Sequence, residues 1–312
     1  MNTRWQLALF LTAVLPAAAQ TPTPPPAAPT SDDLYKLGKQ LFDELAPPEV
    51  KAQYEFPSKE QWDEFAVRLQ RALEGDDLSA LAAYEPEARA ALAALRTIPG
   101  YEDYADWLEQ RLDEIAVARE VTAPRPPTPV PPPPSVARAL PYYDVWLARV
   151  RSRAAPARAA ALMPRLRAAF TAEGVPPELA WLAEAESSLN PAARSPAGAK
   201  GLFQFMPDTA HAMGLGTFMP DERTDPDKSA HAAARYLRTL HGRFGDWPLA
   251  FAAYNAGEGR VSRLLAARHA KTYADIAGAL PAETRMYVPK VCALVAVRAG
   301  VAPENIPPPR GS

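Results

Sequence analysis

The sequence contains few of the residues that build disulfide frameworks or metal centres. It has a single cysteine, Cys292, which excludes an intramolecular disulfide. Cys292 lies in the apolar stretch 288–297, which favours a small buried side chain over a reactive thiol. The histidines show no spacing to clustered Cys or Asp that would indicate metal ligands; they are His211, His231, His241 and His269. We therefore predict neither a metal site nor a cofactor.

An excess of one sign of charge is also absent. The 34 Lys and Arg residues nearly balance the 36 Asp and Glu residues, for a formal net charge of −2. This balance gives no case for nucleic-acid binding and argues against strong attraction to anionic membrane surfaces. The chain also lacks convincing alternating strand patterns, and we predict an all-α fold in one or two globular domains.

Residues 1–19 are typical of a secretory signal peptide. Arg4 gives the positive start, residues 7–15 form the apolar core, and small residues end the segment before Gln20. The apolar core is too short to span a bilayer comfortably, although an uncleaved anchor is the alternative. Because no cysteine follows it, we expect no lipoprotein. The expected product is a periplasmic or exported protein, soluble after cleavage and without stable membrane insertion.

Proline, with 36 residues, is concentrated in two tracts that divide the chain. Residues 20–30 predict an extended, Pro-rich leader. Residues 122–135 predict a polyproline II linker, with a ligand for a proline-binding groove as the alternative. Residues 31–121, between the tracts, predict a small helical domain of unknown role. It is either a spacer or a module with a wall or protein partner, and we expect residues 136–312 to fold without it.

The apolar spacing and the capping residues predict helices in both parts of the chain. In the N-terminal part, we expect helices that begin at Asp32 and Ser58 and helices over residues 78–95 and 101–118. In the C-terminal part, we expect helices at about 141–152, 157–172, 177–188, 208–213, 227–243, 247–256, 258–269 and 282–299.

Glu186 is the most informative residue of the C-terminal part. If residues 178–191 begin with a helix, Leu179, Leu182 and Glu186 share one apolar stripe, whereas Glu184 falls on another, exposed face. A carboxylate at the end of an apolar stripe is desolvated, so its pKa should rise. A protonated Glu at neutral pH is what the general acid of a glycosidase requires. The alternative is a helix-end carboxylate that reaches solvent.

Three more blocks follow along the chain. In residues 192–207, Gly198 and Gly201 predict a tight loop in which the backbone approaches a ligand. Within this loop, the polar Gln204 and the thioether of Met206 alternate with Phe203 and Phe205, so the two pairs should face opposite ways. The other blocks are residues 252–261, with Tyr254 and Asn255, and residues 280–291, with Glu283.

In this order, the four blocks resemble the catalytic domain of the family 1 lytic transglycosylases, which is related to goose-type lysozyme. The shared pattern is a Glu-Ser helix end, a Ser-x-x-Gly-Ala-x-Gly-Leu-x-Gln-x-Met-Pro loop, an Ala-Tyr-Asn-Ala-Gly-x-Gly block and a Glu-Thr-x-x-Tyr-Val helix. It covers roughly residues 140–300. Residues 221–226 and 232–237 look most like the membrane-bound transglycosylase D branch. The resemblance implies an all-α, lysozyme-like catalytic domain over residues 136–312.

The resemblance also implies the residues of the site. Glu186 would be catalytic, and the expected substrate-binding residues are Ser187, Ser195, Gln204, Met206, Tyr254, Asn255 and Glu283. Ser187 is expected to support Glu186 through a local hydrogen bond. The alternative for most of these residues is a role in packing or capping. Two positions depart from the family pattern: Glu258 stands where proline is frequent, and Phe203 stands where Met or Trp is usual.

The activity that the resemblance implies is cleavage of the MurNAc-β-1,4-GlcNAc bond of peptidoglycan without water. One Glu would act as acid and then as base, and the product would carry a 1,6-anhydro-MurNAc end. Cell-wall turnover or remodelling would be the setting. One alternative is a hydrolytic muramidase on the same fold, which needs a second carboxylate to activate water. The other is a non-catalytic peptidoglycan-binding protein.

Overall fold

The computed structural model describes residues 72–75, 77–96, 102–123, 140–195 and 197–311. The predicted signal peptide, the leader and the helix expected from Asp32 lie outside these residues. The helix expected from Ser58 lies outside them as well, apart from its last residues, and so does most of the predicted linker. These predictions stay predictions.

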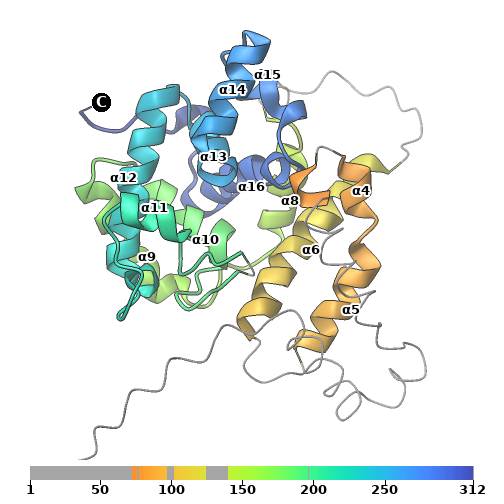
Figure 1. Cartoon of the computed structure of the whole chain (residues 1–312), viewed down its shortest axis with the longest axis horizontal. Coiled ribbons are helices and arrows are strands. Elements are labelled where there is room, and N and C mark those ends of the chain that lie inside the picture. The colour runs from red at the N-terminus through yellow and green to blue at the C-terminus, as the bar shows by residue number, and fades with distance from the viewer. Residues whose placement is uncertain (1–71, 76, 97–101, 124–139, 196, 312) are drawn as a thin grey trace, which may run out of the picture.

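The described residues form helices joined by loops, so the predicted all-α class is confirmed (Figure 1). The N-terminal part contains α4 (Leu78–Ala82), α5 (Glu85–Leu95) and α6 (Glu102–Thr122). The rest contains α8 (Tyr143–Arg151), α9 (Ala159–Ala172), η1 (Pro177–Trp181), α10 (Leu182–Ser187), α11 (Pro207–Ala212), η2 (Glu222–Thr224), α12 (Pro226–Phe244), α13 (Trp247–Ala256), α14 (Glu258–Arg268), α15 (Tyr273–Ile276), η3 (Ala277–Ala279), α16 (Ala282–Ala299) and η4 (Pro303–Asn305).

Local capping chemistry sets several of these boundaries. The carboxylates of Asp77, Asp225 and Asp246 accept backbone N–H groups at the starts of α4, α12 and α13. Helix α12 ends where Gly245 takes a φ of 70°, a conformation that glycine adopts without strain. The break expected near Pro86 separates α4 from α5, with the proline in the first turn of α5.

Helix α16 is the centre of the packing. It contacts α8, α10, α13 and α6, and its side chains are buried along most of its length. Around it lies one connected hydrophobic core, in which the largest fully buried side chains include Trp146, Phe170, Phe203 and Phe251. Cys292 is fully buried in this core, as its apolar neighbours predict.

Helix α6 belongs to this same packing. Leu108, Leu112 and Ile115 are buried, and the helix contacts α10 and α16 as well as α4 and α5. In Figure 1, α6 lies between the pair α4–α5 and the remaining helices. The domain boundaries of the sequence stay predictions. However, the described part of residues 31–121 is not held apart from the C-terminal helices as a spacer would be.

The C-terminal tail packs back onto the helices. The backbone N–H of Arg310 donates to the carbonyl of Gly174 at 2.8 Å, and Trp247 Nε1 donates to the carbonyl of Pro307 at 2.9 Å.

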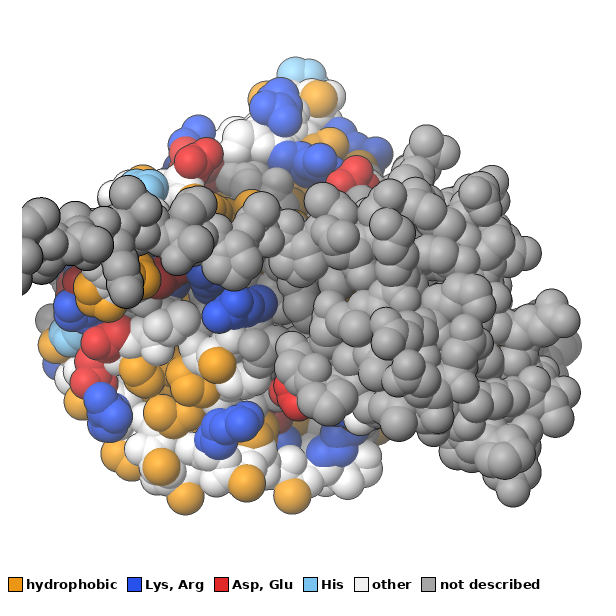
Figure 2. Space-filling view, turned by 60° about the horizontal axis from the view of Figure 1, so that its bottom comes forward, with side chains coloured by type: hydrophobic (Ala, Val, Ile, Leu, Met, Phe, Trp, Pro, Cys, Tyr) orange, Lys and Arg blue, Asp and Glu red, His pale blue; other side chains and the backbone are white. Residues whose placement is uncertain are grey.

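On the face shown in Figure 2, cationic and anionic side chains are both scattered over the described residues, and apolar side chains gather over the lower part. None of the described helices combines the length and the apolar character that crossing a lipid bilayer requires.

Candidate active site

Glu186 lies in the last turn of α10. The chain turns sharply after it, because Ser188 and Leu189 take positive φ values of 50° and 59°. The side chain of Glu186 is half-buried. Burial raises the pKa of its carboxyl group to about 7. The apolar stripe of the sequence predicts such a rise for the residue at this position.

Four neighbouring groups act on the same carboxyl group. A hydrogen bond from Tyr287 lowers the pKa of Glu186, and so do the positive charges of Arg111 and Lys290. The negative charge of Glu283 raises it. The pKa near 7 is therefore a balance between desolvation and charges that come from α6 and α16.

Tyr287 is the direct partner of Glu186. Its hydroxyl donates to Oε1 of Glu186, and its ring is buried. Burial, followed by the charge of Glu186, holds the pKa of Tyr287 well above its usual range, so the phenol stays a donor. Tyr287 belongs to the Glu-Thr-x-x-Tyr-Val block but is absent from the predicted site. The signal that could have found it is its i+4 spacing from Glu283, which places both residues on one face of α16.

Glu184 is not the exposed carboxylate that its helical position predicts. Only 12% of its side chain is exposed, and its carboxylate pairs with the guanidinium of Arg298 at 2.8 and 3.0 Å. The prediction was wrong because the end of α16 covers this second face of α10.

Ser187 also differs from its prediction. Its side chain is buried, and its hydroxyl makes hydrogen bonds to the carbonyls of Leu202 at 2.9 Å and Ala183 at 3.1 Å. The hydroxyl therefore fixes the end of α10 against the loop that follows. It neither lines a substrate surface nor supports the Glu186 carboxylate directly.

The loop of residues 192–206 is held by its own backbone. Ser195 N donates to the carbonyl of Ala199 at 3.0 Å, and Ala199 N donates back to Ser195 Oγ at the same distance. Gly201 has a φ of 80°, and a Cβ there would lie 1.8 Å from the carbonyl oxygen of Arg223. A neighbouring backbone therefore requires glycine at position 201, and the approach of the loop to a ligand stays a prediction.

Arg223 of η2 supports this loop from outside, and the sequence did not indicate this role. It is 4% exposed, and its Nη1 donates to the carbonyls of Gly198 and Phe205, both at 3.0 Å. Its guanidinium also pairs with Asp221 at 2.8 Å and, mainly through this hydrogen bond, holds the pKa of Asp221 well below its usual range. The loop is therefore fastened to the segment before α12.

The alternation at residues 203–206 is confirmed. Phe203 and Phe205 are buried, Gln204 is half-buried and Met206 is 42% exposed. Gln204 takes a φ of 47°, and its Nε2 donates to the carbonyl of Gly201 at 2.8 Å. The loop therefore presents the thioether of Met206 at its end and holds the Gln204 amide close to its own backbone.

Tyr254 connects this loop to the Glu186 site. Its hydroxyl donates to the carbonyl of Phe203 at 2.8 Å, and its ring lies against Tyr236 with centroids 5.3 Å apart. Burial, and next the charge of Glu186, holds the pKa of Tyr254 well above its usual range.

Asn255 and Glu283 form a polar chain beside Tyr254. The Nδ2 atom of Asn255 lies 3.5 Å from Oε1 of Glu283, and its Oδ1 accepts from Thr284 Oγ1 at 2.7 Å. Arg111 Nη1 pairs with the same Glu283 oxygen at 2.7 Å. The structure thus brings Glu186, Tyr254, Asn255 and Glu283 together. Ser195, Gln204 and Met206 lie on the loop that Tyr254 holds.

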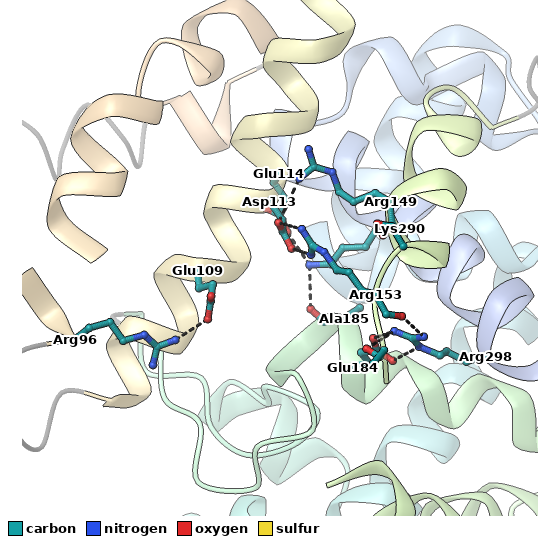
Figure 3. Close-up of polar contacts among 12 residues, drawn as sticks. Arg96, Glu109, Asp113, Glu114, Arg149, Arg153, Glu184, Ala185, Lys290 and Arg298 are labelled. Carbon is teal, nitrogen blue, oxygen red and sulfur yellow. Dashed lines mark hydrogen bonds and ion pairs between the residues drawn. The ribbon is translucent and has the colours of Figure 1, made fainter. Parts of the chain in front are cut away.

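A cluster of ion pairs joins the helices around the site (Figure 3). Asp113 of α6 pairs with Arg149 of α8 at 3.4 Å and with Arg153 just beyond that helix. Glu114 of α6 faces Lys290 of α16 at 3.4 Å. The Asp113 pairs are partly exposed and should each contribute only about 0–1 kcal/mol. Glu114 and Lys290 are buried, so losing Glu114 would leave the charge of Lys290 without this partner.

Comparison with known proteins finds relatives for part of the chain. Residues 166–276 match the family described as Transglycosylase SLT domain. Membrane-bound lytic murein transglycosylase D of Escherichia coli is 40% identical over 124 residues, which are 38% of this chain and 27% of that protein. Soluble lytic murein transglycosylase of Escherichia coli is 37% identical over 120 residues, or 36% of this chain and 19% of that protein.

The chain thus covers about a quarter of the length of these curated relatives or less. Among solved structures, an inactive mutant of the lytic transglycosylase Slt from Pseudomonas aeruginosa superposes with a TM-score of 0.40 at 18% identity, over 90% of this chain and 59% of that chain. Glu186 and the loop that follows it lie inside the family match, whereas α6 and α16 lie outside it. Residues 166–276 of this chain are therefore similar in sequence to the Transglycosylase SLT domain family.

Proposed function

We propose that the protein is a peptidoglycan lytic transglycosylase that cleaves the MurNAc-β-1,4-GlcNAc bond and leaves a 1,6-anhydro-MurNAc end. Glycan strands of peptidoglycan are the substrate partner, and an exported enzyme of cell-wall turnover or remodelling is the setting. The family match and the names of the relatives support this reading.

The observation that carries the proposal is the setting of Glu186, whose carboxyl group is half-buried at the end of α10 and accepts from the Tyr287 hydroxyl. Burial raises its pKa to about 7. Near neutral pH, such a carboxyl group is present as acid and as carboxylate in comparable amounts. It can therefore give a proton in one step and take one in the next.

In the first step, Glu186 donates its proton to the glycosidic oxygen, and the bond from C1 of the muramoyl residue to that oxygen breaks. The carbonyl oxygen of the N-acetyl group of the same sugar attacks C1 and forms an oxazolinium-type intermediate. In the second step, the Glu186 carboxylate takes the proton of the C6 hydroxyl, and O6 bonds to C1 as the acetamido oxygen departs. The proton balance closes, and water is not consumed.

The surroundings of Glu283 favour this route over hydrolysis. Hydrolysis by inversion requires a second carboxylate that activates water, and hydrolysis through a glycosyl-enzyme intermediate requires one that attacks C1. Oε1 of Glu283 already faces the guanidinium of Arg111 at 2.7 Å and the amide of Asn255 at 3.5 Å. We propose that this carboxylate shapes and polarises the site.

Substrate contact is assigned to the groups that remain accessible. Met206 offers an exposed apolar surface for a sugar face. Ser195, Gln204, Tyr254 and Asn255 have polar groups close to the loop, and we keep them as proposed substrate-binding residues. Ser187 is removed from this set because its side chain is buried.

Release of soluble muropeptides from purified sacculi tests the proposal. Glu186→Gln keeps the shape of the side chain but cannot exchange a proton, so turnover should fall by about 10²- to 10⁴-fold. Glu178→Gln is the matched control, since Glu178 lies in η1 and meets Arg167 only at 3.7 Å. It should leave turnover unchanged. A Glu186→Gln variant within about tenfold of the wild type would contradict the assignment.

A further inference from the structure

Helix α6 lies outside the residues that match the SLT domain, yet it presents polar side chains to the Glu186 site. With its nitrogen turned toward α10, the buried amide of Gln110 donates to the carbonyls of Ala185 and Glu186, both at 3.1 Å. Gln110 therefore holds the backbone of the helix end that carries Glu186.

Arg111, the next residue, forms ion pairs with two carboxylates. Its side chain is 15% exposed, and its Nη1 lies 2.6 Å from Oε2 of Glu114 and 2.7 Å from Oε1 of Glu283. These carboxylates lie on different helices, α6 and α16. A guanidinium between them fixes the position of Glu283 relative to α6.

The pairs of Arg111 form a continuous polar path to the site. Glu114 also faces Lys290, and Glu283 also meets Asn255 at the end of α13. The charge-bearing members of the path come from α6 and α16. The cationic and anionic groups that face Glu186 are therefore held in place by a helix from the N-terminal third of the chain.

The charged and titratable groups that act on Glu186 can be named element by element. Arg111 comes from α6; Glu283, Tyr287 and Lys290 come from α16; and Tyr254 comes from α13. Arg111 and Lys290 favour the carboxylate, whereas Glu283 disfavours it. Of the Arg111–Glu283 pair, Arg111 has the larger effect.

We propose that Arg111 is a positioning residue of this site, which holds Glu283 in place and sets the charge environment in which Glu186 gives and takes its proton. The inference rests on the proposed function for its meaning in catalysis, but its electrostatic part can be measured without turnover. It adds to the SLT domain a residue from a helix that the family match does not include.

A merely structural clamp would predict something different. If Arg111 only joined α6 to α16, its loss would lower the unfolding temperature and the amount of folded protein. The titration of Glu186 would then keep its midpoint. A positioning role predicts instead that this midpoint moves, and in a direction fixed by the sign of the charge removed.

The experiment uses the full chain with ¹³C-labelled glutamate carboxyl groups. The Glu186 signal is identified by its loss in Glu186→Gln and is followed by NMR from acid to mildly alkaline pH. Arg111→Gln removes a charge that lowers the pKa of Glu186, so the midpoint should rise by about one pH unit. Glu283→Gln removes a charge that raises it, so the midpoint should fall. Arg111→Lys keeps the charge and should restore most of the wild-type midpoint.

The matched control is Arg119→Gln. Arg119 lies eight residues further along α6, is 66% exposed and pairs with Glu85 at 2.7 Å. Its loss should leave the Glu186 midpoint and the turnover unchanged. If Arg111→Gln fails to fold, the double variant Arg111→Gln/Glu283→Gln removes both members of the pair. Because Arg111 has the larger effect on the pKa of Glu186, the midpoint should still rise.

The same variants are then assayed on sacculi over the same pH range. The alkaline limb of turnover reports loss of the acid form of Glu186, so in Arg111→Gln it should move upward together with the NMR midpoint. An unmoved or lowered NMR midpoint in Arg111→Gln would overturn the inference, and so would an Arg111→Lys variant that behaves like Arg111→Gln. A wild type that releases no product while the midpoints move as stated would contradict the proposed function alone.

Discussion

At the scale of single residues, the pKa of the Glu186 carboxyl group depends on effects of opposite sign. Burial favours its acid form, while the Tyr287 hydroxyl and two cationic side chains favour the carboxylate. Neither influence alone would place the pKa near 7. The residue therefore depends on groups from two other helices for the balance that acid and base chemistry requires.

Because of the raised pKa of Glu186, the free energy of unfolding should be lower at high pH than at low pH. The pKa of Glu186 is raised to about 7 in the folded protein and is about 4.3 in an unfolded chain, so the folded state binds the proton more tightly. The stabilisation is present below the unfolded pKa and is lost as pH rises through about 7. Glu186→Gln removes this dependence. Its stability relative to the wild type should therefore increase by about 3 kcal/mol between about pH 4 and about pH 8.

Urea denaturation of both proteins across that pH range measures the difference. Glu178→Gln serves as the control for loss of a carboxylate outside the site. A difference between Glu186→Gln and the wild type that does not change with pH would show that the carboxyl group is not desolvated.

Glu186 could be predicted because its position on an apolar stripe is a local property of the sequence. Glu184 could not be placed the same way, since its burial depends on Arg298, which is 114 residues away. Tyr287 could have been predicted from its i+4 spacing from Glu283. Arg111 had no local signal, because nothing in its own helix indicates which carboxylates it meets.

At the scale of elements, the loop of residues 192–206 depends on a backbone contact with the segment before α12. Ser187, Arg223 and Tyr254 fasten it from three directions, through hydrogen bonds to backbone carbonyls at Leu202, Phe205 and Phe203. The loop is therefore a fixed wall of the site, and its order should depend on the glycine that permits its closest contact.

Gly201→Ala tests this dependence. A Cβ would lie 1.8 Å from the Arg223 carbonyl oxygen, and the φ of 80° is strained for any other residue. We expect a loss of about 3 kcal/mol or more, because backbone must move on both sides. Gly198→Ala is the matched control: its φ is 91°, but a Cβ there has nothing within 4 Å, so only about 1–2 kcal/mol should be lost. Equal losses in chemical denaturation would show that the contact with Arg223 is unimportant.

Most helices of the C-terminal part agree closely with their prediction, but the helix predicted over residues 177–188 divides into the 3₁₀ helix η1 and the α-helix α10. The boundaries of α13 and α16 coincide with the predicted ranges, and those of α9 and α12 differ by one or two residues. Apolar periodicity and caps are local, so they could be read along the chain. The need for glycine at position 201 could not be predicted from the local sequence, because the contact that requires it comes from Arg223.

At the scale of the whole molecule, α6 connects the N-terminal part to the proposed active site. It buries apolar side chains in the common core and gives the site Gln110, Arg111 and Glu114. The sequence places a proline-rich tract after α6, which is why composition predicts a separable domain there. Contacts between α6 and α16 join residues more than 170 positions apart, and no local pattern reports them.

Deletion of residues 20–135 is the test at this scale. Composition predicts a folded and active fragment, but the deletion removes α6 together with its buried charges and leaves Lys290 without Glu114. The structure therefore predicts an insoluble or inactive fragment, as judged by size-exclusion chromatography, circular dichroism and turnover of sacculi. Deletion of residues 20–30 keeps α4–α6 and is the control that should stay folded and active. A soluble, fully active 136–312 fragment would show that α6 is dispensable.

The most direct test of the proposed chemistry is mass spectrometry of the products that the wild type and Glu186→Gln release from purified sacculi. The proposal predicts muropeptides lighter than the reducing products by one water molecule, formed by the wild type and absent with the variant. Reducing muropeptides from the wild type would contradict it and identify a hydrolase, and anhydro products formed equally by Glu186→Gln would show that another group acts as acid and base.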